Sequence, residues 1–302
     1  MFSLNSSSLH TLNADKNLSY RKQQWYFYLN KINNMIPAIK YQKNFSFKEF
    51  TRTDLGDWNG PTTDSPSRKL SDLFWQSLPW DGIKQELGEI RICDTGCGNG
   101  EYAAKLQRWS GSRISSYIGF DMKNNDNWAG LKVKYPNIRF MQLESDLIGK
   151  YIPADTNCFI TQSALEHLVN DITYFYQLAD YIRNHGKPVI QIHLIPSPIC
   201  LILYGLHGVR QYTPRTVMAI FKLFKHYSYA VLYRLGGKQC NSLHYELIRR
   251  PILEGVGDLR QIEAARYDQQ LKRAIYQDIH SPIGPPTFYA FVIHSYWKQK
   301  YF

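Results

Sequence analysis

Residues 90–100 read Ile-Arg-Ile-Cys-Asp-Thr-Gly-Cys-Gly-Asn-Gly, and this stretch decides the fold of the chain. A short apolar run with β-branched residues ends at Asp94, and glycines follow at alternate positions, 96, 98 and 100. The next residues, 101–109, have the apolar spacing of a helix. A strand, a glycine turn and a helix in this order allow a flat cofactor to touch bare backbone.

The spacing of these glycines separates the turn from two other nucleotide-binding motifs. A dinucleotide fingerprint, G-x-G-x-x-G, would need its third glycine where Glu101 stands. A P-loop needs G-x-x-x-x-G-K-[ST], and the stretch has neither this spacing nor the lysine. The pattern present is D-x-G-x-G-x-G, from Asp94 to Gly100.

D-x-G-x-G-x-G resembles the first motif of the class I S-adenosylmethionine (SAM)-dependent methyltransferases. In that family the glycine turn takes the methionine part of the cofactor. The resemblance therefore implies SAM as the cofactor. The contacts it implies in this segment come from Asp94, Gly96, Cys97, Gly98 and Gly100. The alternative is an ordinary strand-to-helix turn that uses glycine.

Composition predicts a globular, cytoplasmic protein. The chain has 302 residues, enough for one large core or for a core with a smaller cap. Its five cysteines, at 93, 97, 158, 200 and 240, show no paired metal-binding spacing, which is typical of free thiols in a reducing compartment. We see no basic and apolar leader typical of secretion. The most apolar segment, 199–206, is far shorter than the roughly 18 residues of a spanning helix. It is interpreted as a buried element, with peripheral membrane contact as the alternative.

The net charge of +11 is concentrated in the C-terminal part of the chain. Residues 183–302 hold sixteen Lys and Arg against six Asp and Glu. A basic surface attracts nucleic acid, anionic membrane or acidic small molecules. Because the basic residues are dispersed rather than run together, nucleic acid is the disfavoured partner.

Apolar periodicity predicts an α/β fold. We expect strands at 90–94, 116–121, 138–143, 157–162, 188–194, 227–235 and 288–296, with helices at 20–39, 67–78, 101–109, 127–135, 172–184, 213–225 and 259–277. This alternation predicts a seven-stranded, mostly parallel, Rossmann-like sheet with helices on both faces, and seven is the strand count of the class I methyltransferase core. Residues 1–88 form a predicted helical N-terminal extension or cap, of which 1–20 are expected to be loosely held. Residues 89–302 form the predicted SAM-binding domain, with a cap-like insertion at 236–287.

Further cofactor contacts follow from the resemblance. Asp121 ends the second predicted strand, where the family has an acidic residue that accepts the ribose hydroxyls, and Met122 follows it. Asp146, with Glu144 as its competitor, takes the place of the residue that binds the adenine amino group, and the amide of Leu147 would meet the ring. Each carboxylate has an alternative role, as a turn cap or as a solvated loop residue. At the end of the fourth strand, Gln162 completes the expected set.

Residues 161–167, Thr-Gln-Ser-Ala-Leu-Glu-His, resemble the L-E-H segment of a methyltransferase branch that includes small-molecule O-methyltransferases. His167 is expected to be a general base, with an orienting role as the alternative. His193, near the end of the fifth strand, is the second candidate base, with a core histidine as its alternative. Some relatives bind magnesium through E-x-x-E-H. Ser163 replaces the first Glu of that motif here, so no metal is expected. Glu166, His167 and His193 could still form a partial metal site.

Acceptor contacts are predicted at His207, Arg210 and Tyr212, because this segment follows the fifth strand at the mouth of the site. Arg210 could bind a carboxylate or phosphate, or it could be an exposed loop arginine. The predicted reaction is O-methylation of a small-molecule or glycan hydroxyl, such as that of an acidic sugar in polysaccharide biosynthesis. The segment 162–165 lacks the [DNS]-P-P-[YFW] motif of base N-methylation. RNA methylation and a non-catalytic SAM-binding partner protein are the rival interpretations, and the sequence does not indicate an oligomeric state.

Overall fold

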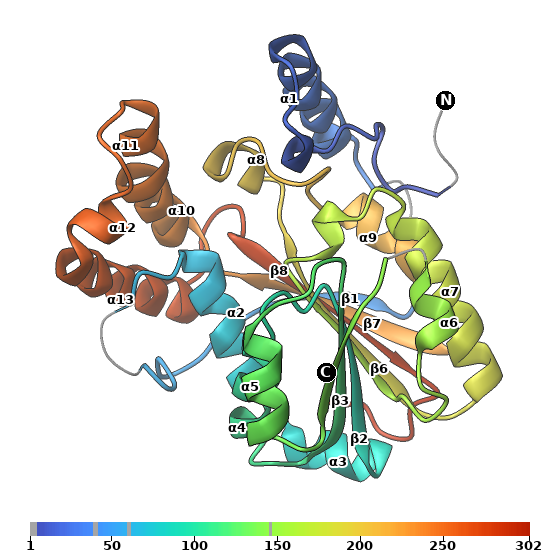
Figure 1. The fold of residues 1–302 in the computed structure, drawn as a ribbon. Coiled ribbons are helices and arrows are strands. Elements are labelled where there is room, and N and C mark those ends of the chain that lie inside the picture. Colours follow the sequence, from blue (N-terminus) through green and yellow to red (C-terminus); the bar gives the residue numbers. More distant parts are fainter. Residues whose placement is uncertain (1–4, 39–41, 59–61, 145–146) are drawn as a thin grey trace.

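The computed structural model describes residues 5–38, 42–58, 62–144 and 147–302, and a twisted sheet runs through their centre (Figure 1). The described residues contain eight strands in the order β1-β7-β8-β6-β5-β2-β3-β4. Their bounds are Phe45–Glu49 (β1), Ile90–Thr95 (β2), Ile114–Asp121 (β3), Ile138–Gln142 (β4), Cys158–Gln162 (β5), Val189–Pro196 (β6), Ser228–Leu235 (β7) and Phe288–Ser295 (β8). β8 is antiparallel to β6 and β7, and all other pairings are parallel.

The expected strand count of seven is wrong, because β1 adds an eighth strand beside β7. Phe45 alone of its residues is buried, and its ring packs on Phe221 and Phe291 at centroid distances of 5.6 and 6.3 Å. A five-residue strand with a single buried side chain has little periodicity to read from the sequence.

The strand order places a crevice next to the glycine turn. From β2 the chain moves outward through β3 to β4, then returns across β2 to β5 and continues to β6. β2 and β5 are therefore the point at which the order reverses. In open α/β sheets, ligands bind beyond the carboxyl ends of the strands at this point.

Helices cover both faces of the sheet (Figure 1). One core cluster joins the sheet to α2 (Pro66–Gln76), α3 (Trp80–Leu87), α4 (Glu101–Trp109), α5 (Asn127–Lys134), α10 (Lys238–His244) and α13 (Ala264–His280). The other joins it to α6 (Ile148–Tyr151), α7 (Asp171–His185) and α9 (Pro214–Phe221). The remaining helices are α1 (Tyr20–Met35), α8 (Cys200–Leu203), α11 (Arg250–Leu253) and α12 (Leu259–Ile262). Within the described ranges no helix has the length and apolarity needed to cross a membrane.

The predicted insertion 236–287 is helical throughout most of its length. α10 continues through a π-helical turn, Tyr245–Arg249, into α11. The single helix expected at 259–277 is instead divided into α12 and α13, because Glu263 leaves helical geometry with φ −124° and ψ 47°. α13 buries Leu271, Ile275 and Ile279 on its inner face. α10 and α13 contact each other and α2, so the insertion packs on the N-terminal extension.

Residues 5–17 are packed against the body of the protein, so the expectation of a loosely held start is wrong for them. The amide of Ser7 donates to Asp171 Oδ1 at 2.8 Å, and that of Ile172 donates to the carbonyl of Asn5 at 3.0 Å. Ser6 and Ser8 are buried. Short polar side chains that look like a solvated tail in sequence are here satisfied by hydrogen bonds with other parts of the chain.

Candidate active site

The glycine turn after β2 brings backbone close to two other segments. Gly96, Gly98 and Gly100 all have left-handed backbone, with φ of 75°, 55° and 78°. A Cβ on Gly96 would lie 2.4 Å from the Cβ of Ala164, so the turn touches the segment after β5. A Cβ on Gly98 would meet nothing within 4 Å. This residue therefore presents bare backbone to an open space.

Asp121, at the end of β3, holds the turn in this shape. Its Oδ2 accepts the amide of Gly98 at 2.8 Å, and its Oδ1 accepts the amide of Lys123 at 3.1 Å. Trp128 Nε1 donates to the carbonyl of Gly98 at 2.9 Å, and the indole stacks on Phe140 at 5.1 Å. Each carboxylate oxygen of Asp121 keeps a second lone pair for a ligand.

A cavity of about 610 Å³ lies beside this turn, at the carboxyl ends of β2, β3 and β5. This volume is typical of sites for small ligands. It brings together eight of the predicted site residues: Asp94, Gly96, Cys97, Gly98, Asp121, Met122, Gln162 and His167. Gly100, which caps α4, and Leu147, which is 39% exposed, do not line it. The predicted adenine ligand Asp146 lies outside the described residues.

The cavity is acidic. Its charged lining consists of Asp15, Asp94, Glu101 and Asp121 against Arg68 and Lys123. Asp94 is the most buried of the carboxylates, and burial raises its pKa to about 7. Its Oδ2 accepts the hydroxyl of Tyr117 at 2.5 Å, whereas its Oδ1 has no hydrogen-bond partner among the described residues. A cationic ligand would satisfy this oxygen.

A second cavity of about 250 Å³ adjoins the first. Its lining is mostly polar: Ser65, Ser67, Arg68, Ser71, Gln162, Ser163, Glu166, Pro196, Tyr204, His207 and Phe288. Arg68, Gln162 and Ser163 line both cavities. Ser163 has left-handed backbone, with φ of 53°, an uncommon conformation that is often found at functional sites. The two cavities therefore form adjacent compartments that share a wall.

Sequence reasoning missed Arg68. It lies in the first turn of α2, and its guanidinium stacks over the Tyr102 ring at 5.2 Å. Ser65 caps this helix by accepting the amide of Arg68 at 3.3 Å. A positive charge in the first turn of a helix is unfavourable, because the helix dipole is positive at that end. This unfavourable position was the sequence signal that could have identified Arg68 as a functional residue.

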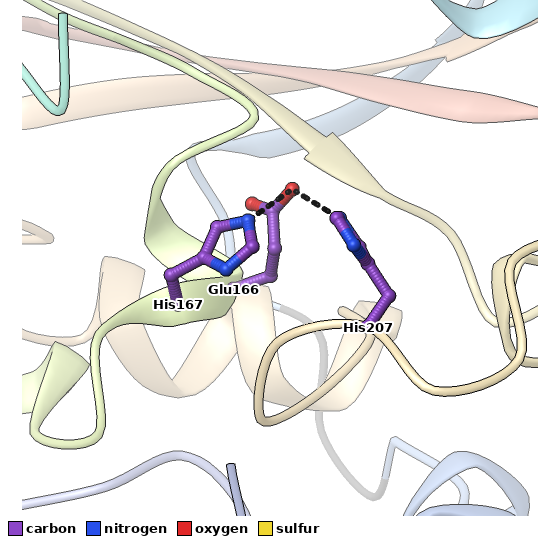
Figure 2. A group of neighbouring side chains, drawn as sticks. All are labelled: Glu166, His167 and His207. Carbon is purple, nitrogen blue, oxygen red and sulfur yellow. Dashed lines mark ion pairs between the residues drawn. The ribbon is translucent and has the colours of Figure 1, made fainter. Parts of the chain in front are cut away.

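The side chains of Glu166, His167 and His207 point toward one another, as Figure 2 shows. Glu166 and His207 line the smaller cavity and His167 lines the larger one, so the cluster lies at the junction of the two. Glu166 Oε1 lies 3.8 Å from His207 Nε2 and 4.0 Å from His167 Nε2. On the other side of the His167 ring, Nδ1 lies 2.6 Å from Asp15 Oδ2. Burial would lower the pKa of His207, but the Glu166 carboxylate raises it above its usual value. The structure thus brings the candidate base His167 and the candidate acceptor ligand His207 to one place.

His193 is not brought to either cavity. It is fully buried, with Nδ1 at 3.0 Å from Thr161 Oγ1 and its ring against Phe175 at 5.1 Å. Burial lowers its pKa to about 3, so the ring is neutral. The prediction that His193 is catalytic is corrected: the alternative of a hydrogen-bonded core histidine describes it.

Arg210 and Tyr212 are also fully buried, which corrects their assignment to the acceptor. Arg210 donates to the carbonyls of Leu165, Leu168 and Val169, and its guanidinium lies 3.4 Å from Asp171 Oδ2. Tyr212 donates to Asp171 Oδ2 at 3.0 Å. These side chains hold the 3₁₀ turn Leu165–His167 (η3) from beneath. Long polar side chains were expected at the surface, but the carbonyls of this turn provide buried acceptors.

Comparison with known proteins gives matches among solved structures alone. No protein-family model matches the sequence, and no curated protein sequence matches it. A SAM-dependent methyltransferase from Archaeoglobus fulgidus is 17% identical over 76% of this chain and 94% of that chain, with a TM-score of 0.45. The plantazolicin methyltransferase BamL, solved with S-adenosylhomocysteine (SAH), is 13% identical over 75% of this chain and 85% of its own, with a TM-score of 0.45. A 1,6-didemethyltoxoflavin-N1-methyltransferase from Burkholderia thailandensis, also solved with SAH, is 11% identical over 82% of this chain and 99% of its own, with a TM-score of 0.42. The chain is thus similar, at low identity, to proteins described as methyltransferases.

Proposed function

We propose that the protein is a SAM-dependent methyltransferase that binds the cofactor in the larger cavity and the methyl acceptor in the smaller one. The observation that carries the proposal is the carboxylate of Asp121, which is fixed over a glycine turn at the point where the strand order reverses. This is where a ribose with two free hydroxyls would find a charged acceptor beside bare backbone.

The charges of the larger cavity support SAM as its ligand. SAM carries a sulfonium and an ammonium group, and the lining is predominantly acidic. The unpartnered Oδ1 of Asp94 is available to the ammonium group, and Arg68 is available to the methionine carboxylate. Met122, which lines this cavity, is proposed to contact the adenosine part.

The smaller cavity supports a small, hydroxylated acceptor. Its volume of about 250 Å³ admits a small molecule or the terminal unit of a longer glycan. Four serine side chains and the guanidinium of Arg68 line it, a set suited to hydroxyl groups and to a carboxylate or phosphate. We therefore propose O-methylation of a small molecule or a glycan unit with an acidic group.

Methyl transfer requires the acceptor oxygen, the methyl carbon and the sulfur to lie in line, with water excluded. The shared wall at Gln162 and Ser163 is where such an alignment would occur. The Gln162 side chain is held by Trp75 Nε1, which donates to its Oε1 at 2.8 Å. The acceptor hydroxyl would lose its proton to the group at the junction that contains His167, Glu166 and His207.

Calorimetry with SAM, SAH and NAD⁺ tests the cofactor. We expect SAM and SAH to bind at one site per chain and NAD⁺ not to bind. Tight binding of NAD⁺ without SAM would overturn the proposal.

Labelled-methyl transfer into fractionated cell extract, followed by mass spectrometry of the product, tests the reaction. A labelled hydroxylated small molecule or glycan is the expected product. Labelled RNA would favour the rival methylation. Cofactor binding with no transfer into any fraction would favour a non-catalytic partner protein.

A further inference from the structure

We propose that Glu166, His167 and His207 bind a divalent transition-metal cation such as Zn²⁺. The three residues offer one carboxylate oxygen and two imidazole nitrogens, and these ligand atoms lie within 4.8 Å of one another. Methyl transfer from SAM does not require a metal, so this binding goes beyond the proposed function.

The carboxylate of Glu166 lacks the partners that a buried charge requires. The side chain is fully buried, and neither oxygen has a hydrogen-bond partner among the described residues. The separations from the two Nε2 atoms, 3.8 and 4.0 Å, are too long for hydrogen bonds. Native structures rarely leave a buried carboxylate in this state unless a cation compensates it.

Asp15 prepares His167 as a ligand. It lies 2.6 Å from Nδ1, so this nitrogen carries the proton and the lone pair stays on Nε2, which is on the side of Glu166. A carboxylate on the far nitrogen of a metal-binding histidine is the usual outer-shell arrangement, because it fixes the tautomer and the ring. Asp15 is itself held in place, since its Oδ1 accepts the amide of Gly208 at 3.2 Å.

The backbone fixes His207 relative to Glu166. The amide of Val209 donates to the carbonyl of Glu166 at 2.7 Å, and Tyr26 donates to the carbonyl of His207 at 2.7 Å. A Cβ on Gly208 would lie 2.7 Å from the Glu166 carbonyl oxygen, so this approach needs glycine. The ligands on two separate loops are therefore held together before any cation binds.

The ligand set selects the class of ion. Imidazole nitrogen suits Zn²⁺, Co²⁺ and similar ions, whereas Mg²⁺ prefers oxygen ligands. Zinc lies about 2.0–2.2 Å from nitrogen and oxygen ligands in tetrahedral geometry, so its ligand atoms are about 3.4 Å apart. Small side-chain rotations would bring atoms that now lie within 4.8 Å to these distances. His193, which the sequence placed in a partial metal site, is excluded by its burial in the core.

The location gives the cation a role that rests on the proposed function. Glu166 and His207 line the acceptor cavity, and His167 lines the cofactor cavity. An open coordination position would therefore face the acceptor. A bound cation supplies Lewis acidity that lowers the pKa of an acceptor hydroxyl. With the cation present, the three side chains are ligands instead of bases, and the acceptor proton passes to solvent.

Metal binding is tested on the full chain stripped of metal by chelation, without SAM. We expect Zn²⁺ to bind at one ion per chain in calorimetry, Co²⁺ to give visible absorption bands, and Mg²⁺ to compete poorly. Glu166→Gln and His207→Ala should each weaken Zn²⁺ binding more than 100-fold. Asp15→Asn, which acts through His167, should weaken it about 10-fold. His280→Ala, at an exposed histidine outside the cluster, is the matched control and should change nothing.

Thermal unfolding distinguishes metal binding from a purely structural role. Glu166→Gln removes a buried charge that has no hydrogen-bond partner among the described residues, so the metal-free variant should melt no lower than metal-free wild type. Zn²⁺ should raise the Tm of wild type but not that of the variant. The proposal is overturned if Zn²⁺ and Co²⁺ fail to bind at one ion per chain, or if Glu166→Gln and His207→Ala bind them as wild type does. SAH binding to the metal-free protein is measured separately, so failure of the metal site and failure of the cofactor site are distinguishable.

Discussion

Asp121→Ala is the sharpest test of the cofactor site. In the structure both oxygens of this carboxylate are already fixed by backbone amides, at 2.8 and 3.1 Å, so ligand binding need not order the side chain. Hydrogen bonds to a charged group contribute about 1.5–3 kcal/mol each. Losing two bonds to ribose hydroxyls therefore costs at least about 3 kcal/mol, which weakens SAH binding by about 100-fold or more.

The fold should tolerate this substitution, because the two hydrogen bonds that it removes are exposed. We expect the free energy of unfolding to fall by only about 1–2 kcal/mol. Calorimetry measures the affinity for SAH and for its 2′-deoxyribose analogue. Wild type should prefer SAH about tenfold, since one charge-assisted bond is missing in the analogue, whereas Asp121→Ala should bind both equally.

Asp126→Ala is the matched control. Asp126 is exposed, lies five residues further along and is not part of the cofactor cavity, so this variant makes the same change in net charge. It should bind SAH as wild type does. A folded Asp121→Ala protein whose Kd for SAH stays within about threefold of wild type would refute the ribose assignment.

Three further predictions concern the surroundings of this site. Burial raises the pKa of Asp94 to about 7, and a bound ammonium group favours the ionised carboxylate. SAH binding should therefore release a proton, and the affinity for SAH should rise about tenfold from pH 6 to pH 8. Calorimetry should find no such rise in Asp94→Asn. Gly96→Ala should lower the Tm more than Gly186→Ala does. Both glycines have positive φ, but only at Gly96 does another atom lie within 4 Å of the added Cβ. Equal decreases in Tm would contradict the close approach of Gly96 to Ala164. Once a methyl acceptor is known, His193→Gln should leave the kcat/KM of the folded enzyme unchanged, whereas His167→Ala should lower kcat/KM about 100-fold or more. The opposite ranking would contradict a buried His193 and a His167 that lines the cavity.

The elements around the glycine turn could be predicted from sequence because their signals are local. The expected helix at 101–109 has the same bounds as α4, and the strand that ends at Asp121 is β3. Glycines at alternate positions and an acidic strand end need no knowledge of distant residues. The elements on either side of the glycine turn were therefore the most predictable part of the fold.

The parts that were missed depend on contacts between distant segments. Arg210 has the same appearance in sequence whether it is exposed or buried, and its burial depends on carbonyls about forty residues away and on Ser6 at the start of the chain. The meeting of His207 with Glu166 likewise depends on the loop after α8 returning to the end of β5. Neither pairing leaves a periodic pattern.

The bridge formed by Asp15 has a consequence for how the protein matures. Asp15 hydrogen-bonds residues 152 and 193 positions later in the chain, and β1 pairs with β7, which is likewise far along the sequence. Contacts this far apart form slowly, because a long loop must close before they stabilise anything. The glycine turn and β3 can assemble from neighbouring segments much sooner. A refolding chain should therefore regain SAH binding before it regains the cluster at Glu166, and an arrested intermediate could hold the methyl donor while remaining unable to use it.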